Sequence, residues 1–205
     1  MSQPEPFERL PSAWEIRVRP SLGRRILGLL GELVQTLLIA GLLFLAVNLV
    51  TARIRVEGSS MEPSLHDGEF VVVNRLVYHL SRVERGDIVV FRYPLDPQRR
   101  FIKRIIGLPG DTVSIHNAQV FVNDTLLNEP YIASSPRYNG EWIVAPGRVF
   151  VLGDNRNNSS DSQNWGTLDM NEIIGKAVLV YWPLRDIGLI PHFELAVASA
   201  DQPGF

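Results

Sequence analysis

Residues 101–122 read FIKRIIGLPGDTVSIHNAQVFV, and this stretch decides the fold. Residues 102–106 have the pattern of a short strand, which ends before Leu108–Asp111 (LPGD), where proline and glycine are typical of a turn. Two short apolar segments follow at 113–115 and 120–122, with the spacing of the two strands of a hairpin. The stretch therefore predicts three short strands separated by turns.

The same pattern continues on both sides of this stretch. The 14 prolines and 16 glycines are spread through the chain, which suits many short strands and turns better than long helices. We therefore expect a mainly β body with extensive loops, including a small inserted flap over 123–147. Further strands are expected at 54–56, 70–73, 87–91, 148–152 and 176–182.

One apolar segment near the N-terminus breaks this pattern. Leu33–Val50 reads LVQTLLIAGLLFLAVNLV and holds 18 residues without a charge, close to the roughly 20 that span a bilayer. Apolar residues 26–31 precede it, so we expect a transmembrane anchor over 26–52. A cleaved signal peptide is disfavoured because the stretch is long and no small-x-small site closely follows it. A buried core helix is the remaining alternative.

Charges at the two ends of the anchor predict its direction. The basic residues near it are Arg17, Arg19, Arg24 and Arg25 on the N-terminal side, and Arg53 and Arg55 on the other. The positive-inside rule then places the N-terminus in the cytoplasm and the residues after 52 outside it. The expected organisation is a cytoplasmic tail over 1–25, the anchor over 26–52, a β domain over 53–192 and a C-terminal tail over 193–205.

The composition excludes several classes of protein. A net charge of −2 gives no sign of the basic face that nucleic-acid binding requires. Cysteine is absent, which excludes a disulfide framework, a cysteine nucleophile and a thiolate metal site.

Two stretches hold residues suited to nucleophilic chemistry. Gly58–Pro63 reads GSSMEP, a tight bend that could expose the hydroxyl of Ser60, although a plain turn is the commoner explanation of such a stretch. On a strand, Lys103 shares a face with Phe101 and Ile105. Apolar surroundings lower the pKa of a lysine, and a neutral lysine can accept a proton from a serine. A surface lysine paired with an acid is the alternative.

A third stretch, Gly153–Ser162, reads GDNRNNSSDS and is typical of a rigid polar loop. Its beginning resembles a calcium loop. An EF-hand requires glycine and glutamate at its sixth and twelfth positions, however, where this chain has Ser159 and Trp165. We therefore predict no metal site here.

The histidines leave one alternative open. They are His66, His79, His116 and His192, and no two have a metal-binding spacing. Any of them could still belong to a Ser-His-Asp triad, because triads follow no fixed order along a chain.

Taken together, the three stretches resemble type I signal peptidase. That family has a Ser-Met-x-Pro box just after an anchor, then Lys-Arg on an apolar strand before Gly-x-Pro-Gly-Asp, then Gly-Asp-Asn-x-x-Asn-Ser-x-Asp-Ser. This chain has all three in order, at Ser60–Pro63, Lys103–Asp111 and Gly153–Ser162. The resemblance extends over about residues 33–190.

The resemblance implies a role for each matching residue. Ser60 is the expected nucleophile and Lys103 the expected general base. Ser159 would orient the lysine amine, and Asp161 would brace the site through Arg104. Backbone N–H groups of Ser60 and Gly58 are the expected oxyanion donors, because Gly58 stands where some members have a serine.

The resemblance also implies the fold, substrates and location. The expected fold is two antiparallel sheets with much loop, after one transmembrane helix. Preproteins would be cut after small-x-small (Ala-x-Ala) sites by a monomer in the plasma (inner) membrane, with an apolar surface resting on the lipid bilayer. No cofactor, metal or nucleic acid is implied. The substrate pockets would be lined by Ile54, Val56, Met61, Leu65, Val71, Val90 and Ile102.

Two other classes share part of this pattern. A self-cleaving Ser-Lys repressor protease resembles this core, but such proteins are soluble and bind DNA. A membrane-anchored scaffold would bind export partners without cutting them. The anchor argues against the first class, and intact Ser60, Lys103 and Ser159 argue against the second.

Overall fold

The computed structural model describes residues 22–193 and 195. The chain divides after Ala46 into two units. The predicted tails over 1–25 and 193–205 lie largely outside the described residues.

Helix α1 (Leu22–Val50) corresponds to the predicted anchor. Its segment Ile26–Val50 holds 25 residues of mean hydropathy 2.3, long and apolar enough to cross a membrane. At 1.5 Å per residue it extends about 37 Å, against about 30 Å for the hydrocarbon layer. The helix ends two residues before the predicted boundary, because Thr51 and Ala52 already belong to the first strand.

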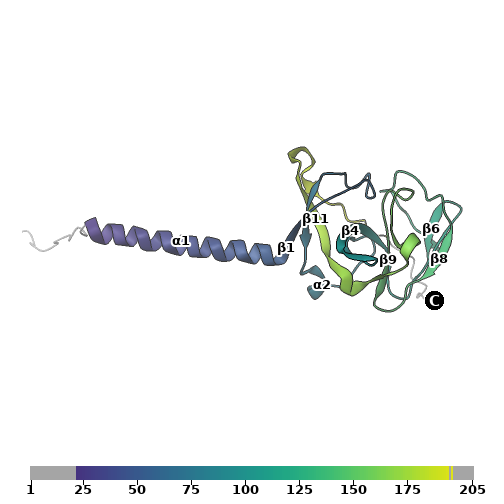
Figure 1. Cartoon of the computed structure of the whole chain (residues 1–205), viewed down its shortest axis with the longest axis horizontal. Helices are drawn as coiled ribbons and strands as arrows, with labels where there is room; N and C mark the ends of the chain where they lie inside the picture. Colours follow the sequence, from purple (N-terminus) through teal and green to yellow (C-terminus); the bar gives the residue numbers. More distant parts are fainter. Residues whose placement is uncertain (1–21, 194, 196–205) are drawn as a thin grey trace, which may run out of the picture. The chain divides into compact units, whose positions relative to one another are not determined.

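The β body contains two antiparallel sheets, which confirms the predicted fold class. The larger sheet has eight strands in the order β1-β2-β11-β3-β4-β9-β10, with β12 paired to β11, and the smaller has the order β7-β6-β5-β8. Within the body, the smaller sheet lies on the side opposite β1, as Figure 1 shows by the labels β6 and β8. The strands are β1 (Thr51–Arg55), β2 (Phe70–Asn74), β3 (Ile88–Tyr93), β4 (Asp96–Gly107), β5 (Thr112–His116), β6 (Gln119–Val122), β7 (Thr125–Leu126), β8 (Gly140–Ile143), β9 (Arg148–Leu152), β10 (Leu168–Asp169), β11 (Ile173–Trp182) and β12 (Gly188–Leu189).

The helices of the body are short. They are α2 (Val77–Leu80), α3 (Ser162–Trp165) and the 3-10 turns η1 (Met170–Glu172) and η2 (Leu184–Asp186). The segment 123–147, expected to form an inserted flap, supplies β7 and β8, which are the two edge strands of the smaller sheet.

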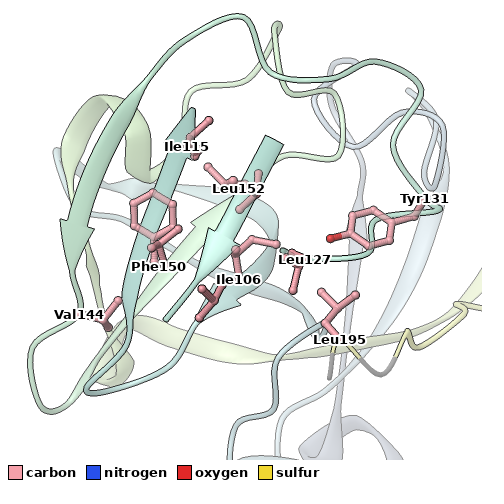
Figure 2. Close-up of a cluster of buried hydrophobic side chains, with 11 residues drawn as sticks. Ile106, Ile115, Leu127, Tyr131, Val144, Phe150, Leu152 and Leu195 are labelled. Atoms are coloured by element: carbon pink, nitrogen blue, oxygen red, sulfur yellow. The ribbon is translucent and has the colours of Figure 1, made fainter. Parts of the chain in front are cut away.

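One apolar cluster joins the two sheets (Figure 2). Ile106, Phe150 and Leu152 come from the larger sheet and pack against Ile115 of the smaller one. These side chains are less than 2% exposed. Burial of such side chains stabilises a fold by about 1.5–3 kcal/mol each, so this cluster fixes β4 and β9 against the smaller sheet.

A second cluster fills the body beside β1 and β2. It contains Val56, Met61, Leu65, Val71, Val73, Ile88, Val90, Ile102, Ala177 and Val180, with Ile54 packed against it. Because Met61 and Leu65 belong to this cluster, the bend that carries Ser60 is held against the core.

Candidate active site

Ser60 lies on the bend that follows β1. Gly58 has a φ of 81°, a left-handed conformation that favours glycine, and its N–H donates to Oδ1 of Asp67 at 2.7 Å. On the other side of Ser60, the buried side chain of Met61 enters the core, and the N–H of Leu65 donates to the carbonyl of Met61 at 3.0 Å. Ser60 therefore lies between Gly58, which is fixed by its hydrogen bond to Asp67, and Met61, which is fixed by burial in the core.

Lys103 lies on β4 and reaches the serine across the sheet. Its Nζ is 2.7 Å from Oγ of Ser60 and 2.9 Å from the carbonyl oxygen of Ile102. The Phe101 ring centroid lies 5.3 Å from the same nitrogen. The structure therefore brings the two principal candidates within hydrogen-bond distance, although they are 43 residues apart in the chain.

Burial lowers the pKa of Lys103 from its ordinary 10.5 to about 8. The carboxylates of Asp161 and Asp154 act in the opposite direction, because their negative charges favour the ammonium form. At pH 7, roughly a tenth of the lysine is then neutral. A neutral amine this close to a serine hydroxyl is able to take up its proton.

The loop after β9 donates hydrogen bonds to the bend that carries Ser60. The backbone N–H of Asn155 donates to the carbonyl of Ser60 at 3.1 Å, and its side-chain amide donates to the carbonyl of Ser59 at 3.1 Å. The amide of Asn158 donates to Oγ of Ser59 at 2.9 Å. Sequence reasoning did not identify Asn155 or Asn158, since such residues in a polar loop look like ordinary turn formers.

Gly153 allows this close approach. A Cβ at this position would lie 2.5 Å from the Ser60 carbonyl oxygen, and it would also overlap the side chain of Ser159. Real Cβ atoms do not come so near to other atoms, so a residue larger than glycine would push the loop away from the nucleophile.

Asp161 organises the same loop. It begins α3 as its N-cap, and its carboxylate accepts from the N–H of Gly153 at 2.9 Å and from the N–H of Gln163 at 3.2 Å. Burial raises the pKa of Asp161, while these N–H groups, the hydroxyl of Ser159 and the charge of Lys103 lower it. Asp161 therefore braces the loop through backbone donors.

Ser159 does not make the contact that was expected of it. The two hydrogen bonds of the Lys103 amine go to Ser60 and the Ile102 carbonyl. The Ser159 hydroxyl is buried near the Asp161 carboxylate, and it makes no hydrogen bond of ordinary geometry in the described part of the chain. The carbonyl of Ile102 thus orients the lysine in this structure.

Arg104 pairs with a different acid from the one expected. Its Nε and Nη2 donate to the two carboxylate oxygens of Asp154 at 2.8 and 2.7 Å, and its Nη1 donates to the Gly86 carbonyl at 2.9 Å. Both side chains are fully buried, and the guanidinium lies 4.0 Å from the Tyr131 ring centroid. The expectation of an Arg104–Asp161 contact is corrected, because Asp154 supplies the bidentate geometry that arginine favours.

Among the residues that the structure describes, one of the two expected oxyanion donors has a free N–H. The Gly58 N–H is already bonded to Asp67, so it is not free to bind a developing negative charge. The Ser60 N–H takes part in no hydrogen bond within residues 22–193. Gly58 is therefore corrected as a backbone donor, and Ser60 remains the candidate.

A cavity of about 680 Å³ opens beside the pair. Three of the predicted pocket residues line it, Ile54, Val90 and Ile102. The other four, Val56, Met61, Leu65 and Val71, are fully buried in the adjoining cluster. All seven predicted pocket residues therefore lie at or behind the cavity wall, three on its surface and four in the core that supports it.

The cavity lies between two strand edges. Among the described strands, β1 pairs only with β2, and β4 pairs with β9 only from Arg104 onward. Residues 53–55 of β1 and 98–103 of β4 line the same cavity. Their unpaired edges could accept an extended peptide as an added strand.

The histidines lie away from this site. His66 contacts Glu69, His116 stacks on Phe121, and His192 contacts Asp87. None of the four lines the cavity, so the geometry favours lysine over histidine as the partner of Ser60.

One group of side chains away from the cavity has the geometry of metal ligands. Glu84, Asp87 and His192 offer ligand atoms within 4.8 Å of one another. The ammonium of Lys176 lies 2.5 Å from Oδ1 of Asp87, however. This cation already neutralises the buried carboxylate, and the cluster is explained as an ion-pair network.

Comparisons with known proteins point to one family. The family described as "Signal peptidase, peptidase S26" matches residues 30–182. "Probable signal peptidase I-2" of Synechocystis sp. is 40% identical over 167 residues, which cover 78% of this chain and 76% of that protein. "Signal peptidase I" of Leptolyngbya laminosa is 38% identical over 167 residues, covering 77% and 82%. Among solved structures, a crystal structure of a signal peptidase I from Enterococcus faecalis V583 is 30% identical and covers 47% of this chain and 97% of that one, with a TM-score of 0.44.

Proposed function

The chain belongs to the signal peptidase family, peptidase S26, and from this premise we propose that it cuts preproteins through an acyl-enzyme formed on Ser60, with Lys103 as the general base. Membership of the family makes it a serine endopeptidase that acts on preproteins. The observation that carries the mechanism is the distance of 2.7 Å between Ser60 Oγ and Lys103 Nζ, at a lysine that is 3% exposed.

The reaction follows from this contact. Neutral Lys103 accepts the proton of the Ser60 hydroxyl while Oγ attacks the carbonyl carbon of the scissile peptide. The oxyanion that forms accepts a hydrogen bond from the Ser60 N–H. The ammonium of Lys103 then donates its proton to the leaving amine, and the C–N bond breaks to leave an ester on Ser60.

The second half of the reaction, hydrolysis of the ester, restores the free enzyme. Lys103, neutral again, takes a proton from a water molecule that attacks the ester carbonyl. The C–O bond to Ser60 breaks, and Oγ takes the proton back from Lys103. No other group is needed to balance the protons.

A preference for small-x-small sites is supported by the shape of the cavity. A peptide added between β1 and β4 would present alternate side chains to the same wall. That wall is made by Ile54, Val90 and Ile102 and is backed by a fully packed core. Small apolar side chains such as alanine at the first and third positions before the cut would fit there.

The apolar helix α1 is consistent with a membrane-anchored enzyme. We propose that it crosses the plasma (inner) membrane once with its N-terminus in the cytoplasm, on the evidence of four arginines at or before its first turn and two after its end. The β body would then work outside the cytoplasm, on the lipid surface where signal peptides are held. A monomer suffices, since Ser60, Lys103 and the cavity come from one chain.

The test uses the full-length protein in detergent with a precursor that carries an Ala-x-Ala site. Ser60→Ala and Lys103→Ala are each expected to reduce kcat by at least about 10³-fold, because they remove the nucleophile and the base. Ser134→Ala, an exposed serine outside the cavity, is the matched control and should cut normally. Cleavage that persists in the Ser60 or Lys103 variant would refute the mechanism.

A further inference from the structure

Four arginines line the catalytic cavity away from the reacting atoms. Arg53 and Arg55 lie on β1, Arg99 and Arg100 lie on β4, and all four are exposed. We call this set the arginine rim. Glu57 is the one acidic residue that lines the cavity with them. Throughout residues 22–193, no ion pair involves any arginine of the rim.

Their place along the strands gives their distance from the cut. Arg100 and Arg99 precede Lys103 by three and four residues on β4. At about 3.3 Å per residue these arginines lie roughly 10 and 13 Å from the base along the strand. An extended peptide beside β4 advances at the same rate, so the rim faces the residues three and four positions away from the one at the scissile bond.

The start of β1 indicates which half of the substrate lies there. Helix α1 ends at Val50 and Arg53 follows three residues later, so the β1 part of the rim comes directly after the anchor in the chain. The apolar segment of a signal peptide is held in the same membrane and precedes the cut. The residues between that segment and the cut would therefore enter the cavity past the rim.

We propose that the arginine rim is a specificity determinant that favours an acidic side chain at the fourth or fifth residue before the cut and disfavours lysine or arginine there. The inference rests on the proposed function, since it concerns the substrate of the same site. Each exposed charge pair is weak in water. Four charges of one sign along one cavity nevertheless add their fields, and the low-dielectric protein walls focus them.

The experiment compares three precursors with one Ala-x-Ala site and Glu, Gln or Lys at the fifth position before the cut. The full-length enzyme in neutral detergent is expected to cut the Glu precursor with a kcat/KM about tenfold above the Lys precursor. In about 1 M salt the Debye length falls to about 3 Å, and the ratio should fall to about two. Arg100→Glu should reverse the order, and Arg99→Gln with Arg100→Gln should remove it while the Gln precursor is still cut.

Arg185→Gln is the matched control, because Arg185 is 84% exposed and lies outside the catalytic cavity. It should keep the tenfold preference. Equal rates for the Glu and Lys precursors, with the Gln precursor cut normally, would overturn the inference and leave the proposed function intact. A Gln precursor that is not cut at all would overturn both. A rim variant that slows all three precursors alike, and only on vesicles of anionic lipid, would assign the arginines to the lipid surface and refute their role in selection.

Discussion

Replacing Lys103 with methionine tests the buried base through stability as well as activity. Methionine has a similar length and no charge, so the cavity wall keeps its volume. The variant should be inactive, because no group remains to take the proton of Ser60. It should also be more stable than the wild-type protein at neutral pH.

The magnitude follows from the lysine pKa. Burial holds that pKa at about 8 in the folded chain, against 10.5 ordinarily. At about 1.4 kcal/mol per pKa unit, the charged lysine costs the folded state about 3 kcal/mol below pH 8. Methionine removes that cost. With a urea dependence of about 2 kcal/mol per molar, the unfolding midpoint should rise by about 1.5 M at pH 7.

The pH dependence has a definite sign. Between about pH 8 and 10.5 the folded wild-type chain has released the lysine proton and the unfolded chain still binds it. The stability of the wild type therefore rises with pH across this window. The methionine variant has no such group, so its advantage should shrink to nothing near pH 10.5. Packing differences and the lost contact with Ser60 stay constant with pH, and they cancel in this comparison.

Urea titration of both full-length proteins in detergent, followed by tryptophan fluorescence at pH 7 and 10.5, measures the effect. Lys176→Met is the matched control with the opposite sign. It leaves Asp87, which is 1% exposed, without its ammonium partner, and should destabilise the protein. A stability difference between Lys103→Met and wild type that is the same at both pH values would refute the buried neutral base.

Three further predictions concern the same site. The kcat/KM of the wild type should rise about tenfold from pH 6 to 7 and level off above about pH 8, because the base acts when neutral; a profile that is flat over this range would exclude Lys103. Gly153→Ala should lower kcat by about 10²-fold with little change in KM, because the added Cβ displaces the Ser60 carbonyl; unchanged kinetics would show that the loop tolerates the shift. Asp154→Asn should lower the free energy of unfolding by about 3–5 kcal/mol, since it leaves the buried charge of Arg104 unpaired. Urea titration measures this change, and a loss under 1 kcal/mol would contradict the role of Asp154 as the partner of Arg104.

Local patterns in the sequence were enough to predict the anchor, most of the longer strands and the two residues proposed to react. Strands such as 102–106 and 148–152 were predicted because alternation and turn residues are local properties of the chain. The anchor was predicted because a run of 18 uncharged residues is also a local property of the sequence. Ser60 and Lys103 were identified through motif order and spacing, and the structure places them in contact.

The partner of each polar group, in contrast, depends on how distant parts of the chain pack together. Asp154 and Asp161 are chemically equivalent in the sequence, and the choice of Asp154 by Arg104 depends on a bidentate geometry between strands and loops 50 residues apart. The Gly58 N–H was available in principle until the fold placed Asp67 against it. In the same way, Arg53 and Arg99 share one cavity because β1 and β4 face each other across it. Such contacts depend on non-local packing, because hydrogen bonds and ion pairs require positions and angles that the order of residues does not specify.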